Sequence, residues 1–148
     1  MLLTATPRPI KPTLPPSDQL ELSIDLIDGE FREYLDAKTL IDRADALGDL
    51  LYVILWGFNI HGIDSEPIFN EIQRSNMTKL WTTSEIGSDK FDHECMTRTL
   101  VISPTTSDPN FRCYCVRHTD NGKALKSPSY SPANLKPIIE AQISNSIH

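Results

Sequence analysis

Apolar residues in the first half of the chain recur at the spacing of an α-helix. From Asp18 to about Asp36 they lie three or four positions apart, with acids between them, which predicts an amphipathic helix with one buried face. Ser17 or Asp18 is placed to cap its first turn. The apolar positions are Leu20, Ile24, Ile27, Phe31 and Leu35.

Thr39 and Asp42 have the spacing of a capping box, which predicts a second helix that runs to about Asn59. The second half of this helix is apolar around nearly its whole circumference, so other helices must surround it. A single amphipathic neighbour cannot do so. We therefore expect a homo-oligomer, a dimer or a tetramer, in which a second copy completes the bundle.

The rest of the chain alternates between helical and β-prone segments. Gly62 ends the second helix, and Asp64 or Ser65 with Pro67 starts a third that reaches Met77. Two β-prone runs, 99–102 and 111–116, predict a hairpin. Ser131-Pro132 predicts the start of a last helix.

These elements predict an all-α fold with a small β-hairpin-like insertion. The predicted divisions are a proline-rich arm (1–17), a helical core (18–81), an insertion that forms a hairpin or loop (82–121), and a C-terminal segment with its helix (122–148).

Composition excludes several classes of function. The 148 residues carry a net charge of −6, which argues against binding to nucleic acid or to anionic membranes. The longest apolar run, Leu50 to Phe58, is far shorter than the about 20 residues that span a bilayer. The N-terminal residues do not resemble a secretory signal. Three cysteines do not make a disulfide framework, so we expect a reducing, cytoplasmic setting.

Acids concentrate on the first two predicted helices. The segment from Asp18 to Asp49 contains ten acids and three bases, so its net negative charge is larger than that of the whole chain. Residues three, four or seven positions apart share a helix face, where uncompensated like charges repel. A hard divalent cation such as Mg²⁺ would relieve that repulsion; a solvated face, or acids favoured by the helix dipole, is the alternative. The same-face acids are Glu30 and Glu33 on the first helix and Asp42, Asp45 and Asp49 on the second.

Asp45 and Asp49 are expected to be buried because they lie in the most apolar stretch of the chain.

In the insertion, thiols and imidazoles suggest a zinc clamp, but their spacing lacks the usual two-residue gap, so free cysteines are the favoured interpretation. His61 is expected to cap the second helix or lie on the surface. The insertion residues are His93, Cys95, Cys113, Cys115 and His118.

Three segments together resemble the MazG-like all-α nucleotide pyrophosphohydrolases, close to their phosphoribosyl-ATP pyrophosphohydrolase-like members: DRADALGDLLYVILWGFNIHGID, EPIFNEIQRSNMTKLW and GKALKSPSYSPANL. The resemblance covers about residues 20–81 and 121–140. It implies a MazG-like helical bundle completed by dimerisation. It also implies Mg²⁺-dependent hydrolysis of a nucleoside triphosphate or phosphoribosyl-ATP to the monophosphate and pyrophosphate.

The family's metal motifs, EExxE and ExxD, fall on residues 29–33 and 42–45. Gly29 replaces the leading glutamate of the first motif, and Asp42 replaces the glutamate of the second. For such a reaction a carboxylate must take the proton of the attacking water, and we expect Glu30 or Glu33 to be that base. The resemblance implies that four acids are metal ligands: Glu30, Glu33, Asp42 and Asp45. Asp49 is expected to be an additional ligand or to lie just behind the ligands.

The RSNMTK segment implies nucleotide contacts by Asn76 and Lys79, and GKALKSP suggests a second basic contribution from Lys123 and Lys126. A lysine can act as a point charge against a phosphate, but any of these lysines could instead be simply solvated. The motif departures leave two further interpretations open: a divergent, non-catalytic nucleotide-binding protein, or a structural helical dimer.

Overall fold

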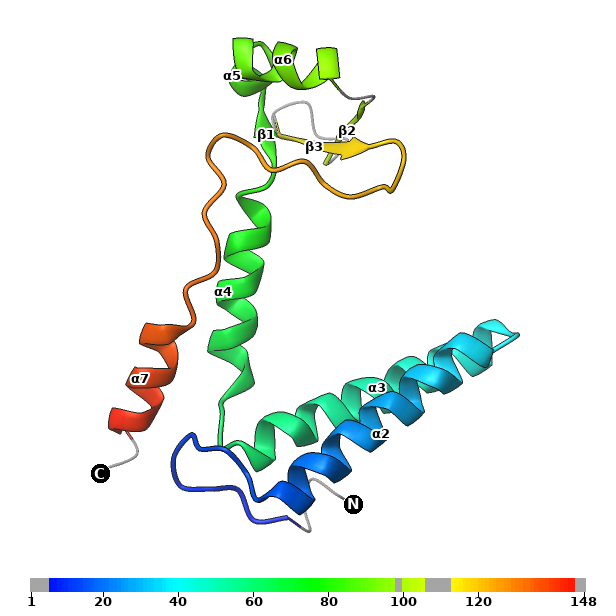
Figure 1. Cartoon of the computed structure of the whole chain (residues 1–148), viewed down its shortest axis with the longest axis vertical. Helices are drawn as coiled ribbons and strands as arrows, with labels where there is room; N and C mark the ends of the chain where they lie inside the picture. Colours follow the sequence, from blue (N-terminus) through cyan, green and yellow to red (C-terminus); the bar gives the residue numbers. More distant parts are fainter. Residues whose placement is uncertain (1–5, 98–99, 106–112, 146–148) are drawn as a thin grey trace. The chain divides into compact units, whose positions relative to one another are not determined.

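The computed structural model describes residues 6–97, 100–105 and 113–145 (Figure 1). The described chain is mostly helical, with one small three-stranded sheet. None of its helices is by itself long and apolar enough to cross a membrane. The elements are α2 (Ser17–Asp36), α3 (Leu40–Ile60), α4 (Ser65–Met77), β1 (Trp81–Thr82), α5 (Thr83–Ile86), α6 (Asp89–Thr97), β2 (Leu100–Pro104), β3 (Cys113–His118) and α7 (Lys136–Asn145).

The chain divides into two units. One comprises residues up to 68 together with those from 135 onward, and the other comprises residues 69–134. In the first unit α2 and α3 lie side by side along their length (Figure 1). Gly57 allows a close approach, because a Cβ there would lie 3.4 Å from the hydroxyl oxygen of the buried Ser23. The buried side chains of α3 are Ala46, Val53, Trp56 and Ile60.

The predicted capping box at the start of α3 is confirmed. The Thr39 hydroxyl accepts a hydrogen bond from the Asp42 amide, and the Asp42 carboxylate accepts one from the Thr39 amide, both at 3.1 Å. Two amide groups that the helix cannot pair internally are thereby satisfied.

Replacing Thr39 by alanine is expected to lower the free energy of unfolding by about 0.5–2 kcal/mol, because the Asp42 amide loses its acceptor. Urea unfolding followed by circular dichroism measures the loss. Thr39→Ser retains the hydroxyl and is expected to behave like the wild type. Equal stabilities of the alanine and serine variants would contradict the capping role.

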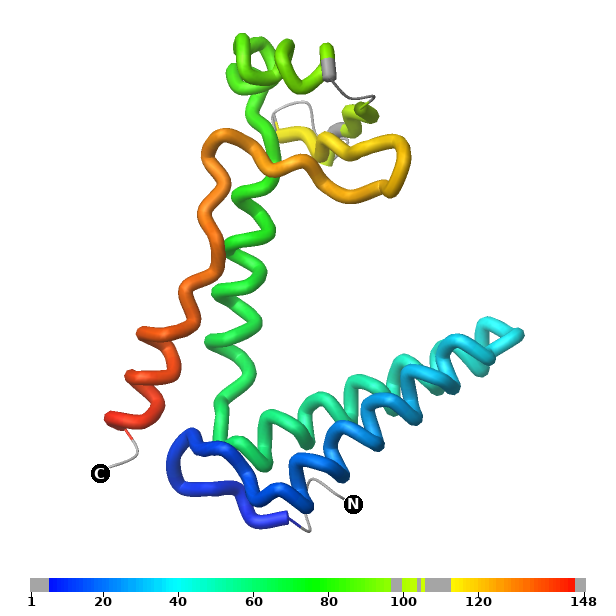
Figure 2. Tube along the Cα trace, in the orientation of Figure 1, coloured from blue at the N-terminus to red at the C-terminus, as the bar shows by residue number. Residues whose placement is uncertain are grey.

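The proline-rich segment, described from residue 6, forms neither helix nor strand and packs on the C-terminal end of α3 (Figure 2). The indole nitrogen of Trp56 donates to the hydroxyl of Thr6 (3.2 Å), and Arg8 donates to the carbonyl of Gly62 (3.2 Å). Gly62 has a φ of +66°, and a Cβ there would lie 2.8 Å from the carbonyl oxygen of Lys11. The close approach of this segment therefore depends on glycine.

The second unit contains an antiparallel sheet in the order β1-β3-β2. The expected pair of antiparallel strands is present as β2 and β3, with Ile102 opposite Val116. Both strands extend two residues later than predicted; the predicted positions 99, 111 and 112 lie outside the described residues. The core of the unit packs Trp81, Phe91, Val116 and Leu125 together.

Several predicted boundaries are wrong. The sequence pattern missed β1, α5 and α6. Pro16 occupies the N-cap position of α2, without a side-chain cap, in place of Ser17 or Asp18. The last helix starts at Lys136 and not at Ser131, because the preceding backbone bonds elsewhere: the Ser131 amide donates to the Thr78 hydroxyl (2.9 Å).

Candidate active site

Glu30 lies within electrostatic reach of predicted site residues on both helices. It is half-buried on α2, whereas Glu33, Asp45 and Asp49 are exposed. Partial burial raises the pKa of Glu30, and the charges of Glu33, Asp49 and Asp45 raise it further. Glu33 on α2 and Asp45 and Asp49 on α3 are therefore close enough to Glu30 for their charges to act on it.

These acids do not form a set of metal ligands as they stand. Within the described residues no three His, Cys, Asp or Glu side chains lie close enough together to hold a metal ion. Carboxylate oxygens are the hard donors that Mg²⁺ prefers. The chemistry of the acids therefore fits Mg²⁺, and the side chains would have to turn toward one another to bind it.

Asp42 has a structural role at the start of α3. Its carboxylate is bonded to Thr39, and that hydrogen bonding lowers the pKa of Asp42. Asp42 is not among the charges that raise the pKa of Glu30. To be a metal ligand as predicted, Asp42 would have to bind the metal while its carboxylate also accepts the hydrogen bond from the Thr39 amide.

The expectation that Asp45 and Asp49 are buried is wrong for the single chain. Both are exposed, and so are the neighbouring Leu47 and Leu51, which retain 51% and 57% of their accessible surface. The reason is that α2 covers only one side of α3, so the apolar residues around the acids have no cover within the chain.

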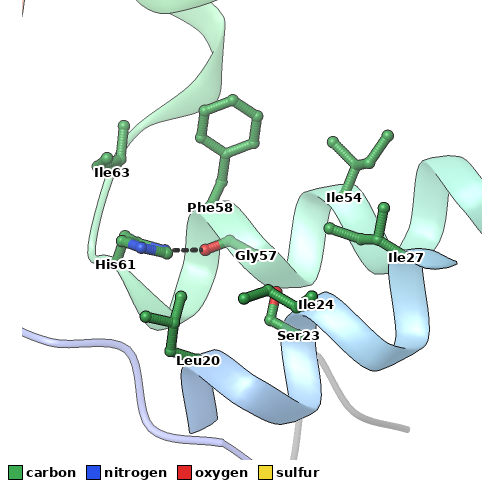
Figure 3. A pocket seen from close by; sticks show the side chains of 9 residues that line it. All are labelled: Leu20, Ser23, Ile24, Ile27, Ile54, Gly57, Phe58, His61 and Ile63. Atoms are coloured by element: carbon green, nitrogen blue, oxygen red, sulfur yellow. Dashed lines mark hydrogen bonds between the residues drawn. The ribbon is translucent and has the colours of Figure 1, made fainter. Parts of the chain in front are cut away.

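An apolar pocket of about 370 Å³ lies between α2 and α3 (Figure 3). Ile24 and Ile27 line it from α2, and Ile54 and Phe58 line it from α3. The C-cap residue of α3, His61, donates from Nδ1 to the carbonyl of Gly57 at 2.7 Å, which confirms its capping role. The lining is almost wholly apolar, so this pocket does not suit a triphosphate.

The predicted nucleotide-contacting residues all belong to the second unit. The Lys79 ammonium donates to the side-chain oxygen of Asn76 at 2.8 Å, so these two residues are brought together. Lys126 lies over the ring of Tyr130, 4.4 Å from its centroid, as a cation–π contact. Lys123 is exposed.

Sequence reasoning missed an ion pair beside Asn76. Arg74 donates two hydrogen bonds to the Glu71 carboxylate, at 2.8 and 2.9 Å, and the Asn134 amide donates a third at 2.8 Å. These bonds lower the pKa of Glu71 to about 2. The spacing of Glu71 and Arg74, three positions apart on a helix, is the signal that could have identified the pair.

Two comparisons with known proteins bear on this site. No curated protein matches the chain at a significant level. The family model for phosphoribosyl-ATP pyrophosphohydrolase matches residues 3–76, half of the chain, and this segment includes both acidic helices and Asn76. The chain therefore belongs to the phosphoribosyl-ATP pyrophosphohydrolase family.

Proposed function

We propose that this protein is a Mg²⁺-dependent nucleotide pyrophosphohydrolase that cleaves a nucleoside triphosphate or phosphoribosyl-ATP into the monophosphate and pyrophosphate. Its family is one of pyrophosphohydrolases, which act on phosphoric anhydride bonds. The observation that carries the proposal is the family match over residues 3–76, which includes both acidic helices, and the repulsion of Glu30 by acids of both helices supports it. A cationic ligand would relieve that repulsion.

Glu30 is the proposed catalytic base, with Glu33 as the neighbour that could replace it. Its raised pKa makes its carboxylate a better acceptor for the proton of an attacking water. When bound, Mg²⁺ supplies positive charge against the phosphate oxygens. The residues that would hold it are Glu30, Glu33, Asp42 and Asp45, with Asp49 as an additional ligand.

Lys79 is the proposed counter-charge for a substrate phosphate. Its hydrogen bond to Asn76 restricts where its ammonium group can lie, which lowers the entropic cost of binding. The remaining polar groups of the Asn76 amide are then available to the sugar or base. Lys123 and Lys126 are proposed as a second basic contribution.

Pyrophosphate release from phosphoribosyl-ATP and from a panel of nucleoside triphosphates tests the proposal directly. We expect turnover of at least one substrate with Mg²⁺ and none after chelation by EDTA. Absence of turnover across the panel would contradict the enzymatic proposal.

A non-catalytic nucleotide-binding protein is the second candidate, and it is favoured by Gly29 in the first motif and by Asp42 acting as a helix cap. If no turnover is found, thermal melts distinguish a non-catalytic nucleotide-binding protein from a structural dimer. A binding protein would be stabilised by Mg²⁺-nucleotide in a concentration-dependent way, and a structural dimer would not.

We also propose that the exposed apolar surface of α2 and α3 is covered by a second copy of the chain. Single exposed apolar side chains are ordinary, but many of them on one pair of helices point to an interface. The more exposed members are Leu22, Ile24, Phe31 and Leu35 on α2 and Leu40, Ile41, Leu47 and Leu51 on α3.

Leu51→Glu is expected to convert the dimer or tetramer to a smaller species, because it places a charge in the proposed interface. Light scattering coupled to size-exclusion chromatography measures the mass. Met96→Glu is the control, since Met96 is 87% exposed and lies in the other unit. An unchanged mass for Leu51→Glu, or a monomeric wild type, would argue against this interface.

A further inference from the structure

A second pocket, of about 400 Å³, lies within the first unit and is lined by three segments that are far apart in the sequence. Arg8, Pro9 and Pro12 line it from the proline-rich segment, Asp64 from the loop between α3 and α4, and Gln142 from α7. No residue of the proposed hydrolytic site belongs to this lining. Unlike the pocket between α2 and α3, it is lined largely by polar groups, so it suits a small polar ligand.

Hydrogen bonds fix the walls of this pocket relative to one another. The side-chain oxygen of Gln142 accepts from the Asp64 amide at 2.7 Å, and its side-chain nitrogen donates to the Asp64 carbonyl at 3.1 Å. These two bonds tie α7 to the loop between α3 and α4. Arg8 ties the proline-rich segment to the same loop by donating to the Gly62 carbonyl. The walls are therefore in place before a ligand binds, which lowers the entropic cost of binding.

Two side chains of opposite charge, Arg8 and Asp64, line the pocket without pairing with each other. Among the described residues neither takes part in an ion pair. One guanidinium nitrogen of Arg8 donates to the Gly62 carbonyl at 3.2 Å, and one carboxylate oxygen of Asp64 accepts from the Glu66 amide at 3.3 Å. In the part of the chain that the structure describes, the other guanidinium N–H groups and the second carboxylate oxygen have no partner.

We propose that this pocket binds a small zwitterion, an α-amino acid with an apolar side chain. The ligand's carboxylate accepts hydrogen bonds from the guanidinium of Arg8, whose planar donors match two carboxylate oxygens. Its ammonium group donates to the carboxylate of Asp64. Pro9 and Pro12 give its side chain an apolar wall.

The pairing of opposite charges in one pocket selects against simpler ions. Asp64 repels an anion such as phosphate, and Arg8 repels a metal cation or an amine. A ligand that carries both charges satisfies both side chains. Because its two charged groups bind segments from opposite ends of the sequence, the ligand also stabilises the folded first unit.

Isothermal titration calorimetry of the full chain with L-leucine, without nucleotide or Mg²⁺, tests the proposal independently of hydrolysis. We expect saturable binding and a melting temperature that rises with leucine concentration. N-acetyl-L-leucine lacks the ammonium group, and L-leucinamide lacks the carboxylate. Each should bind about tenfold more weakly or worse, because each loses a hydrogen-bonded charge pair.

Two variants remove one charge each and keep the structural hydrogen bond. Arg8→Gln retains an N–H for the Gly62 carbonyl, and Asp64→Asn retains an oxygen for the Glu66 amide. Both should bind leucine about tenfold more weakly or worse. Lys11→Gln is the matched control, since Lys11 is an exposed cation of the same segment that does not line the pocket. It should bind leucine like the wild type.

Four outcomes would overturn the proposal. They are no saturable binding of leucine, equal binding of leucine and its two analogues, undiminished binding by Arg8→Gln or Asp64→Asn, and binding of phosphate in preference to leucine. Circular dichroism verifies that each variant has folded.

Discussion

Glutamine in place of Glu30 is expected to lower the rate of pyrophosphate release by about 10²–10⁴-fold, the usual contribution of a positioned general base. The substitution preserves shape but removes the proton acceptor. It also removes one of the repelling charges on the two acidic helices. Steady-state kinetics across a pH series measures the effect. The wild-type rate should fall at acidic pH as Glu30 becomes protonated; the pKa of Glu30 is raised in the metal-free chain, and bound Mg²⁺ would lower it.

Asp25→Asn provides the matched control, because Asp25 is an exposed acid on the same helix and is outside the proposed site. We expect it to retain wild-type turnover. If the Glu30 and Asp25 variants were equally active, Glu30 would not be the base. Glu33→Gln would then be the next variant to measure.

Alanine in place of Trp81 is expected to lower the free energy of unfolding of the second unit by about 3–5 kcal/mol. Trp81 is fully buried, its indole nitrogen donates to the Leu125 carbonyl at 3.0 Å, and its ring meets Phe91 edge-on at 5.5 Å. Truncation leaves a cavity at the centre of a small core. Hydrogen exchange should show the loss of protection in residues 81–125.

Trp81→Phe separates packing from hydrogen bonding. It keeps most of the aromatic contact and deprives the Leu125 carbonyl of its donor, which costs about 1–3 kcal/mol. We therefore expect the phenylalanine variant to be more stable than the alanine variant. The reverse order, or protection lost equally in α2 and α3, would contradict the role assigned to Trp81.

The helices were predicted well where the signal is local. The capping box of Thr39 and Asp42 depends on groups three residues apart, so it can be recognised in the sequence. The same signal exists at Thr82 and Glu85, which cap α5, but that helix has four residues and no apolar period to accompany it. β1 has only two residues, too few to show alternation.

Boundaries that depend on long-range contacts could not be predicted. Ser131-Pro132 has the local pattern of a helix start, yet Arg74 donates to the Pro132 carbonyl and the Asn134 amide donates to Glu71. These partners lie about 60 positions earlier in the chain. The bonds engage the backbone of residues 131–134 and delay the helix to Lys136.

The candidate site was predicted as a set of residues but not as an arrangement. Helical spacing identified Glu30 with Glu33 on one helix, and Asp42, Asp45 and Asp49 on the next, as acids that share a face. The packing of α2 on α3 makes Glu30 the half-buried acid whose pKa the others raise. Spacing along the sequence does not determine that packing. The pairing of Lys79 with Asn76 likewise became visible only in the structure.

Two separate constraints act on Gly62, its positive φ and the backbone carbonyls close to it, and together they limit which residues can replace it. Its positive φ could be met by asparagine at modest strain. The second constraint is steric. A Cβ at position 62 would lie 2.8 Å from the carbonyl oxygen of Lys11 and 3.1 Å from that of Pro9, so every side chain would clash there. Asparagine at position 62 would thus be tolerated only after the N-terminal segment had moved away. The absence of a Cβ at Gly62 therefore sets the order of these two evolutionary changes.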